Sequence, residues 1–291
     1  MPAATSDLTV TSRDEIFRRA QIDPVWWMEH GCGWKLWEKQ REIAMALTQH
    51  KRVAVPASFG VGKTWISGAI ALWWLYNHYP AKVITTAPTA RQVKDLLWSE
   101  IRTLHKKSKR KLGGDPLKMQ LTLEDEWFAV GFSTDEENID KFTGYHSPNL
   151  LLIFDQAAGI PRSLWRAAEG LVIGTNCRWL AISNTTDSGS AMADICIPGR
   201  KSEFGDWHII KINAYDSPNI KAGRDIIPGI IGHNWLNERR KVWRVTDPLW
   251  RIFVEAEFVE ETSMTVLLNE HIVKMLRTDN LPDPDFSDIH I

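Results

Sequence analysis

The segment from Ala57 to Thr64 contains the residue types best suited to chemistry. Its sequence, ASFGVGKT, matches the pattern G-x-x-x-x-G-K-[ST] at every position except the first, where alanine replaces glycine. The residues before it, 52–55, are mostly apolar and predict a strand, while 63–76 carry a broad apolar face and predict a helix. A strand, a glycine-bearing loop and a helix N-terminus direct backbone N–H groups and a positive dipole end toward one point. The segment therefore predicts a phosphate-binding loop and a nucleotide site.

Two residues of this loop have an expected role toward ATP. Lys63 is expected to reach the β- and γ-phosphates, and the Thr64 hydroxyl is expected to be a ligand of Mg²⁺. The first position starts the turn and need not touch phosphate, so Ala57 is a mild departure. The loop residues expected to bind the nucleotide are Ala57, Ser58, Phe59, Gly60, Val61, Gly62, Lys63 and Thr64.

A second element supports the same chemistry. Residues 150–154 are an unbroken apolar run, as expected for a central parallel strand covered on both faces, and the run ends in Asp155. Open parallel sheets place their ligand-binding groups at the carboxyl ends of strands. Asp155 is therefore predicted to hold Mg²⁺ together with Thr64.

The next residue, Gln156, departs from what ATP-hydrolysing motors usually carry. They follow the aspartate with a glutamate that accepts a proton from the attacking water. An amide orients water by hydrogen bonds but has no useful basicity near neutral pH. Gln156 is either an engineered Glu→Gln change that arrests hydrolysis or a natural variant that relies on another base.

Two further polar positions are candidates for nucleotide contacts. Gln40, on a predicted helix over 35–50, could place its amide against the adenine edge, although a lone glutamine on a helix is usually just solvated. Asn184 lies in a polar stretch, 182–186, that follows another predicted strand and could sense the γ-phosphate. The alternative for that stretch is an ordinary Ser/Thr cap or turn.

Composition limits the class of protein. The chain has 291 residues, which suits one large domain or a domain with a small appendage, and a net charge of −1. That charge excludes a globally basic nucleic-acid binder but leaves room for local basic clusters, the densest of which is 106–111. No stretch is long enough for a membrane span, and three cysteines without metal-ligand spacing predict free thiols. Fifteen tryptophans favour core packing or subunit contact over base stacking.

Strand and helix patterns alternate along the chain. This alternation predicts an α/β fold of the P-loop NTPase type, with a mostly parallel sheet and helices on both faces, plus a small lid. The predicted units are an N-terminal helical arm (1–33), an ATPase core (34–214), the lid (215–262) and a linker (263–291). The predicted helices are 13–30, 89–105, 162–171 and 235–244, and the predicted strands are 82–87, 127–132, 149–155, 178–183, 207–213 and 250–258.

Taken in order, these elements resemble the ATPase domain of the large terminase subunit, the DNA-packaging motor of tailed bacteriophages. The resemblance covers most of residues 34–260. Its motifs are the Gln40 segment, GVGKTW at 60–65, TAPTARQV at 86–93, the strand and turn at 151–160, the coupling motif SNT at 183–185, and 250–258 at the close of the lid.

The resemblance implies an ATP- and Mg²⁺-dependent motor that moves double-stranded DNA into a procapsid, independently of sequence. It implies a monomer in isolation and a ring of subunits when assembled with the portal protein and the small terminase subunit. It also implies action in the host-cell cytoplasm, away from membranes and outside the mature virion. An arginine from one subunit would complete the next subunit's site, and the candidates for this position are Arg91, Arg102 and Lys141.

The sequence departs from the family in three ways. Gln156 replaces the catalytic glutamate, and the loop offers Ser58 and Phe59 where many relatives carry an arginine. Too few residues follow the lid for the nuclease domain that large terminases normally contain, so no cleavage activity is expected of this chain. Two alternatives remain: a scaffold that binds ATP without hydrolysing it, which Gln156 would permit, and a helicase-like DNA translocase.

Overall fold

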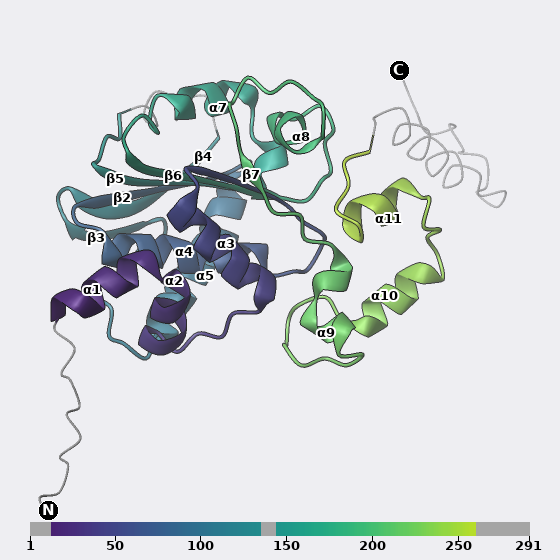
Figure 1. The fold of residues 1–291 in the computed structure, drawn as a ribbon, viewed down its shortest axis with the longest axis horizontal. Helices are drawn as coiled ribbons and strands as arrows, with labels where there is room; N and C mark the ends of the chain where they lie inside the picture. Colours follow the sequence, from purple (N-terminus) through teal and green to yellow (C-terminus); the bar gives the residue numbers. More distant parts are fainter. Residues whose placement is uncertain (1–12, 135–143, 260–291) are drawn as a thin grey trace, which may run out of the picture.

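The computed structural model describes residues 13–134 and 144–259 and is built around one seven-stranded sheet (Figure 1). The strand order is β3-β4-β2-β5-β6-β1-β7. Only the β3–β4 pair is antiparallel, and every other pairing is parallel. The strands are β1 (Arg52–Pro56), β2 (Ala81–Ala87), β3 (Gln120–Glu124), β4 (Trp127–Ser133), β5 (Asn149–Asp155), β6 (Asn176–Ser183) and β7 (His208–Ile209).

Helices cover both faces of this sheet, as the sequence predicts. One hydrophobic cluster joins the sheet to the helices before β1 and to α4 and α5, and a second cluster joins the opposite face to α7 and α8. The first set is α1 (Arg13–Ile22), α2 (Pro24–Trp26), α3 (Glu38–Gln49), α4 (Lys63–Asn77) and α5 (Trp98–Lys107). The second set is α7 (Arg162–Glu169) and α8 (Ala191–Cys196).

The central strands are buried because they are covered on both sides. All residues of β2 are buried, and so are all but the first residue of β1 and of β5. Seven tryptophans are fully buried in the two clusters, which confirms the core-packing interpretation of their number. They are Trp27, Trp73, Trp74, Trp98, Trp165, Trp179 and Trp250.

Two predicted helices are less regular than expected. The predicted helix over 13–30 is divided into α1, α2 and a π-helical turn (Trp27–Gly31), because Asp23 caps a new helix with Pro24 in its first position. The predicted helix over 89–105 begins with a π-helical segment (Gln92–Leu97) before α5.

Two strand predictions need correction, and one strand is not predicted. The predicted strand over 207–213 is reduced to β7 and one further bridge at Ile212. The predicted strand over 250–258 is wrong, because Pro248 starts a helix there, α11 (Pro248–Phe253). The sequence does not predict β3, since it is a largely exposed edge strand without a clear apolar run.

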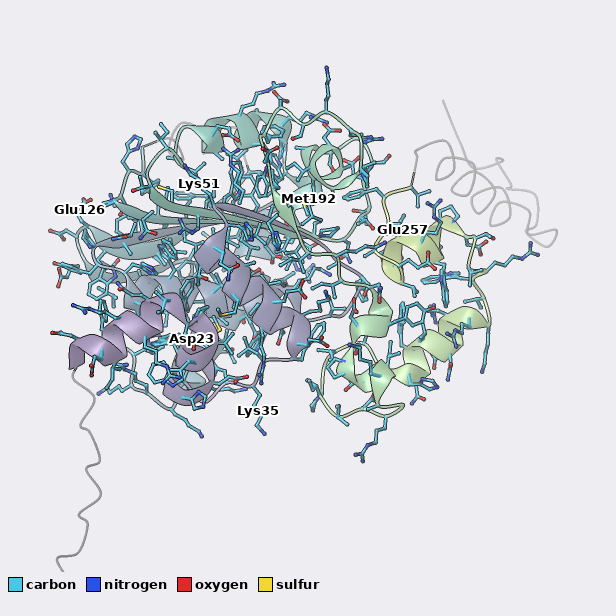
Figure 2. All side chains as sticks on the ribbon, in the orientation of Figure 1. Asp23, Lys35, Lys51, Glu126, Met192 and Glu257 are labelled. Carbon is cyan, nitrogen blue, oxygen red and sulfur yellow. The ribbon has the colours of Figure 1, made fainter. Side chains whose placement is uncertain are left out.

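The described part of the lid, 215–259, is made of short helices beside the sheet (Figure 1). They are α9 (Pro218–Lys221), α10 (His233–Arg240) and α11. Figure 2 shows Glu257 just beyond α11, while Met192 lies on the helical layer formed by α7 and α8. Along the described helices, none has both the length and the apolar character required to cross a bilayer.

Candidate functional site

The loop after β1 adopts the conformation that the glycine pattern predicts. Gly60 and Gly62 have φ values of 68° and 78°, a region that favours glycine, and Gly62 immediately precedes the first residue of α4. A Cβ on Gly62 would also come within 3.0 Å of the Gln40 amide nitrogen. The loop is fixed to the sheet because Ala57 N–H donates to the carbonyl of Ser183 at 2.8 Å.

Lys63 occupies the centre of this loop and is only 7% exposed. Its Nζ donates a hydrogen bond to the Ser58 carbonyl at 2.8 Å. Burial lowers the pKa of Lys63 to about 8, and the nearby Asp155 carboxylate opposes that shift. The ammonium group is thus held inside the loop by an oxygen of the chain, in a position where phosphate oxygens could replace that partner.

Asp155 and Thr64 meet across the two elements that the sequence predicts to converge. The Thr64 hydroxyl donates to Asp155 Oδ2 at 3.2 Å. Burial raises the pKa of Asp155 to about 6, against the effects of Lys63, Thr64 and the Gln156 N–H. A hydroxyl and a carboxylate side by side are hard oxygen donors of the type Mg²⁺ prefers, so these residues fit that ion.

Gln156 is held in an uncommon backbone conformation. Its φ and ψ are 54° and 43°, in the left-handed region that few residues other than glycine adopt. Its N–H donates to Asp155 Oδ1 at 3.1 Å, and its carbonyl accepts from Gly159 at 3.0 Å. Such conformations persist where the surroundings impose them, commonly at functional sites. Here the strained turn places Gln156 on the wall of the cavity beside the loop.

The loop opens into a cavity of about 540 Å³. The cavity is bounded by the phosphate-binding loop and the start of α4, by the segment around α3, by α5, and by the lid. The residues that line it are Lys35, Trp37, Gln40, Phe59, Gly60, Val61, Gly62, Lys63, Thr64, Trp65, Glu100, Gln156, Asn184, Ile227, Pro228, Gly229 and Ile230. Lys35 is exposed and extends outward from the ribbon in Figure 2.

Gln40 is buried, so the solvated alternative for this residue is wrong. Its Oε1 accepts from the Trp37 N–H at 3.4 Å, and its Nε2 donates to the Gly62 carbonyl at 3.5 Å. Gln40 therefore caps α3 and supports the phosphate-binding loop while also lining the cavity.

Asn184 also supports the loop. Its Nδ2 donates to the Ala57 carbonyl at 2.9 Å, and the next residue, Thr185, donates through its hydroxyl to the Ile252 carbonyl at 3.4 Å. The turn after β6 thus links the phosphate-binding loop to the lid. The side chain of Asn184 is engaged across the fold rather than in a local cap.

The lid contacts the loop directly through backbone atoms. Ile231 N–H donates to the Gly60 carbonyl at 2.7 Å, and Phe59 N–H donates to the Phe253 carbonyl at 3.2 Å. The Phe59 and Phe253 rings also meet edge to face with centroids 6.0 Å apart. The lid therefore forms one wall of the cavity, a contact that sequence analysis did not locate because it joins residues about 170 to 190 positions apart.

The two described candidates for an arginine finger, Arg91 and Arg102, do not line the cavity. Arg91 is exposed at the start of the π-helical segment, and Arg102 donates to the Lys118 carbonyl at 2.7 Å. Lys141 lies outside the described residues. An arginine that acts on a neighbouring subunit must be exposed, and Arg91 meets that requirement.

Sequence analysis missed several residues that line the cavity. Trp37 stands next to the Gln40 motif and could have been included on that ground. Glu100 and the lid residues 227–230 have no motif of their own and reach the site only through tertiary packing. Among the described residues, no group of three or more His, Cys, Asp or Glu side chains could hold a metal by itself.

Comparison with solved structures finds the same fold in phage large terminases. The ATPase domain of the Thermus phage P74-26 large terminase matches with 18% identity and a TM-score of 0.57, over 81% of this chain and 99% of that domain. The chain has the fold of a large terminase ATPase domain. The resemblance predicted from the sequence is thus confirmed at the level of the fold.

A second match is the large terminase of another thermophilic bacteriophage, in complex with ADP. It shares 11% identity with a TM-score of 0.58, over 77% of this chain and 54% of that protein. The chain thus spans about half the length of this second terminase, which has also been solved with ATP-γ-S. No protein-family model and no curated protein sequence matches the chain.

Proposed function

We propose that this chain binds ATP with Mg²⁺ and is the ATPase motor of viral genome packaging, coupling hydrolysis to translocation of double-stranded DNA into a procapsid. The observation that carries this proposal is the meeting of Lys63, Thr64 and Asp155 at the carboxyl edge of a sheet with the terminase fold. Loops of this type bind phosphate through backbone N–H groups, a lysine and the positive end of a helix.

Different residues of the site would bind different parts of ATP. Lys63 would exchange its bond to the Ser58 carbonyl for phosphate oxygens, and the backbone from Gly60 to Thr64 would surround the phosphates. When bound, Mg²⁺ would neutralise phosphate charge, held by Thr64 and Asp155. The nucleoside end would lie toward Trp37, Gln40 and the lid, which line the same cavity.

The proposal includes slow hydrolysis by this chain. Gln156 can orient a water through its amide but cannot accept a proton from it. This single residue also favours the second candidate function, a scaffold that binds ATP without turning it over. A faster enzyme on replacement of Gln156 by Glu distinguishes the motor from the scaffold.

The proposed assembly, partners and location follow from the same similarity in fold to large terminases. In a packaging motor of this kind, several copies form a ring on a portal protein, work with a small terminase subunit in the host-cell cytoplasm, and grip DNA independently of sequence. Arg91 is the proposed arginine finger toward the neighbouring copy, because a guanidinium stabilises charge on a transferring phosphoryl group.

Calorimetric titration with ATP and Mg²⁺ tests the nucleotide site. Lys63→Ala is expected to remove detectable binding, because it removes the ammonium group that is buried in the loop. Lys51→Ala is the matched control, since Lys51 is an exposed lysine whose Nζ bonds the Ile173 carbonyl outside the loop. Equal affinities of Lys63→Ala and the parent chain would remove the assignment of the phosphate-binding loop.

A further inference from the structure

Glu100 is an acidic residue on the wall of the nucleotide cavity, although nothing in its own sequence context marks it. It lies in the first turn of α5, and it lines the cavity together with Thr64 and Gln156. Among the described residues that line this cavity, Glu100 is the only carboxylate. The Asp155 carboxylate is buried, and it is bonded to Thr64 and to the backbone of Gln156.

Close packing of α5 on α4 places Glu100 there. Gly68 allows this approach, because a Cβ at that position would lie 3.5 Å from the Ile101 nitrogen and 3.3 Å from a methyl carbon of Leu104. Gly68 is one helical turn beyond Thr64 on α4. The backbone next to Glu100 therefore lies against the first turns of α4, close to the phosphate-binding loop.

Buried neighbours fix the position of this turn of α5. Trp98 and Ile101, on either side of Glu100, are fully buried in the core. The Trp98 indole N–H donates to the Thr85 hydroxyl of β2 at 3.0 Å. Because β2 is a central strand, Glu100 is presented to the cavity from a rigid element.

The Glu100 carboxylate has no partner to explain its position. It is half-buried, and within residues 13–134 and 144–259 no hydrogen bond or salt bridge to it is formed. Burial raises its pKa above the usual value, with Lys107, on the same helix, acting in the opposite direction. A partly desolvated and unpaired acid is costly, and such groups are found where they perform chemistry.

We propose that Glu100 is the general base for the slow ATP hydrolysis of this chain. The proposal rests on the proposed function, and it assigns to α5 the role that the residue after Asp155 has in other motors. Glu100 would orient the attacking water and accept one of its protons as the water oxygen bonds to the γ-phosphorus. The bond from that phosphorus to the β–γ bridging oxygen breaks, its electron pair leaves with ADP, and Glu100 releases the proton to solvent as inorganic phosphate departs.

The experiment measures ATP binding and ATP turnover separately in the full chain, with Lys63→Ala as background. Glu100→Gln keeps the size of the side chain and removes its basicity. Asp95→Asn is the matched control, because Asp95 is an exposed acid on the π-helical segment just before α5. We expect Glu100→Gln to lower turnover at least about 10²-fold, with unchanged ATP affinity, and Asp95→Asn to leave both unchanged.

The same Glu100→Gln change in a chain that also carries Gln156→Glu distinguishes a general base from a residue that only supports the fold. In Gln156→Glu, a carboxylate follows Asp155, so the added Glu100→Gln change is expected to have little effect on turnover. A residue needed only for structure would reduce turnover by the same factor in both backgrounds. That outcome, or a Glu100→Gln chain that hydrolyses ATP like its parent, overturns the assignment.

The remaining outcomes distinguish this inference from the function on which it rests. A parent chain that binds ATP but shows no turnover above Lys63→Ala has no hydrolysis for Glu100 to assist, which overturns the inference and leaves the nucleotide site intact. A parent chain that binds no ATP overturns the proposed function itself.

Discussion

The carboxyl edge of the sheet and the lid both line one cavity, but they are built in different ways. The sheet edge is formed by buried side chains whose bonds converge, with Lys63 on Ser58 and Asp155 on Thr64. The lid contributes mainly backbone contacts, from Ile231 to Gly60 and from Phe59 to Phe253. Charged chemistry is thus concentrated on the rigid wall at the sheet edge. The lid is held by main-chain bonds to the loop and by apolar side chains, among them Trp250, that share a hydrophobic cluster with the sheet.

The largest expected effect concerns the rigid wall. Gln156→Glu is expected to raise ATP turnover by about 10²- to 10⁴-fold, because a carboxylate in this position can accept the proton of the attacking water. Steady-state hydrolysis measures the change, and Gln156→Asn is the control that alters the side chain without adding a base. The assay should be repeated at concentrations that favour assembly, since an isolated subunit lacks a neighbour's arginine. Equal rates for Gln156→Glu and the parent would show that the rigid wall still lacks a catalytic group other than this carboxylate.

The next effect concerns the core, where burial lowers the pKa of a histidine and so makes stability depend on pH. His78, at the end of α4, stacks on Trp74, and burial lowers its pKa to about 4 from an ordinary value of 6.5. As pH falls below 6.5, the unfolded chain takes up a proton that the folded chain refuses until about pH 4. The free energy of unfolding should therefore fall in this window by up to about 1.4 kcal/mol per pH unit.

Urea unfolding at about pH 7 and about pH 5, on either side of the ordinary histidine pKa, measures this loss. His78→Gln, which does not titrate, is the comparison, because the difference between the two chains isolates the histidine from other groups, including Asp155. Parallel pH dependence of the two chains would contradict the effect assigned to His78.

A smaller effect is expected on the lid wall. Phe253→Ala removes the contact with Phe59 and the stacking on Trp243, while its backbone bond to the loop can remain. Aromatic pairs contribute about 0.5–1.5 kcal/mol, so ATP affinity should fall by no more than about tenfold. Tyr79→Ala is the control, because it removes an aromatic contact with Trp127 that lies outside the cavity. Complete loss of ATP binding in Phe253→Ala would show that the lid is as essential as the loop.

The smallest effect per subunit concerns DNA binding. The experiment tests whether the ATPase core or the lid binds the DNA. The basic cluster of the ATPase core, 106–111, is called the core cluster. It continues from the last turn of α5 into the segment where Lys109 N–H bonds the Cys32 carbonyl. The basic cluster of the lid, 239–241, is called the lid cluster. It lies at the end of α10, and its Arg239 stacks over Trp243. A grip on phosphates should weaken with salt and vary little among DNA sequences.

Neutralising the basic residues of the core cluster should make the salt dependence of DNA binding shallower in the assembled, ATP-loaded ring. The substituted residues are Lys106, Lys107, Lys109, Arg110 and Lys111. Multiple copies in a ring would add weak contacts, so the monomer is expected to bind feebly. Neutralising the lid cluster is the comparison. An unchanged slope for the first set and a reduced slope for the second would place the grip on the lid.

The sequence is informative where the residues that act together are close along the chain. The phosphate-binding loop and the run ending in Asp155 are contiguous patterns, and the structure places both at the carboxyl edge of the sheet. The helix at Pro248 resembles a strand in sequence because its apolar residues alternate over a short span, although proline in a first turn is a helix signal.

Other parts of the site have no local signal. Glu100 reaches the cavity because Gly68 lets α5 approach α4, and neither residue indicates this alone. Gln40 does have a signal in the sequence, since its segment is one of the motifs of the resemblance, but the position of its amide between Trp37 and Gly62 is not apparent there. Such contacts depend on how elements pack, which a periodic pattern does not specify.

The junction between loop and lid has an evolutionary consequence. Two of its hydrogen bonds join main-chain atoms, from Ile231 N–H to the Gly60 carbonyl and from Phe59 N–H to the Phe253 carbonyl. Every residue except proline carries the same donor and acceptor, so either lid position can change its side chain without losing the bond. Selection can therefore let the lid diverge and adapt to new partners, while it holds the chemistry of Lys63 and Asp155 constant at the sheet edge.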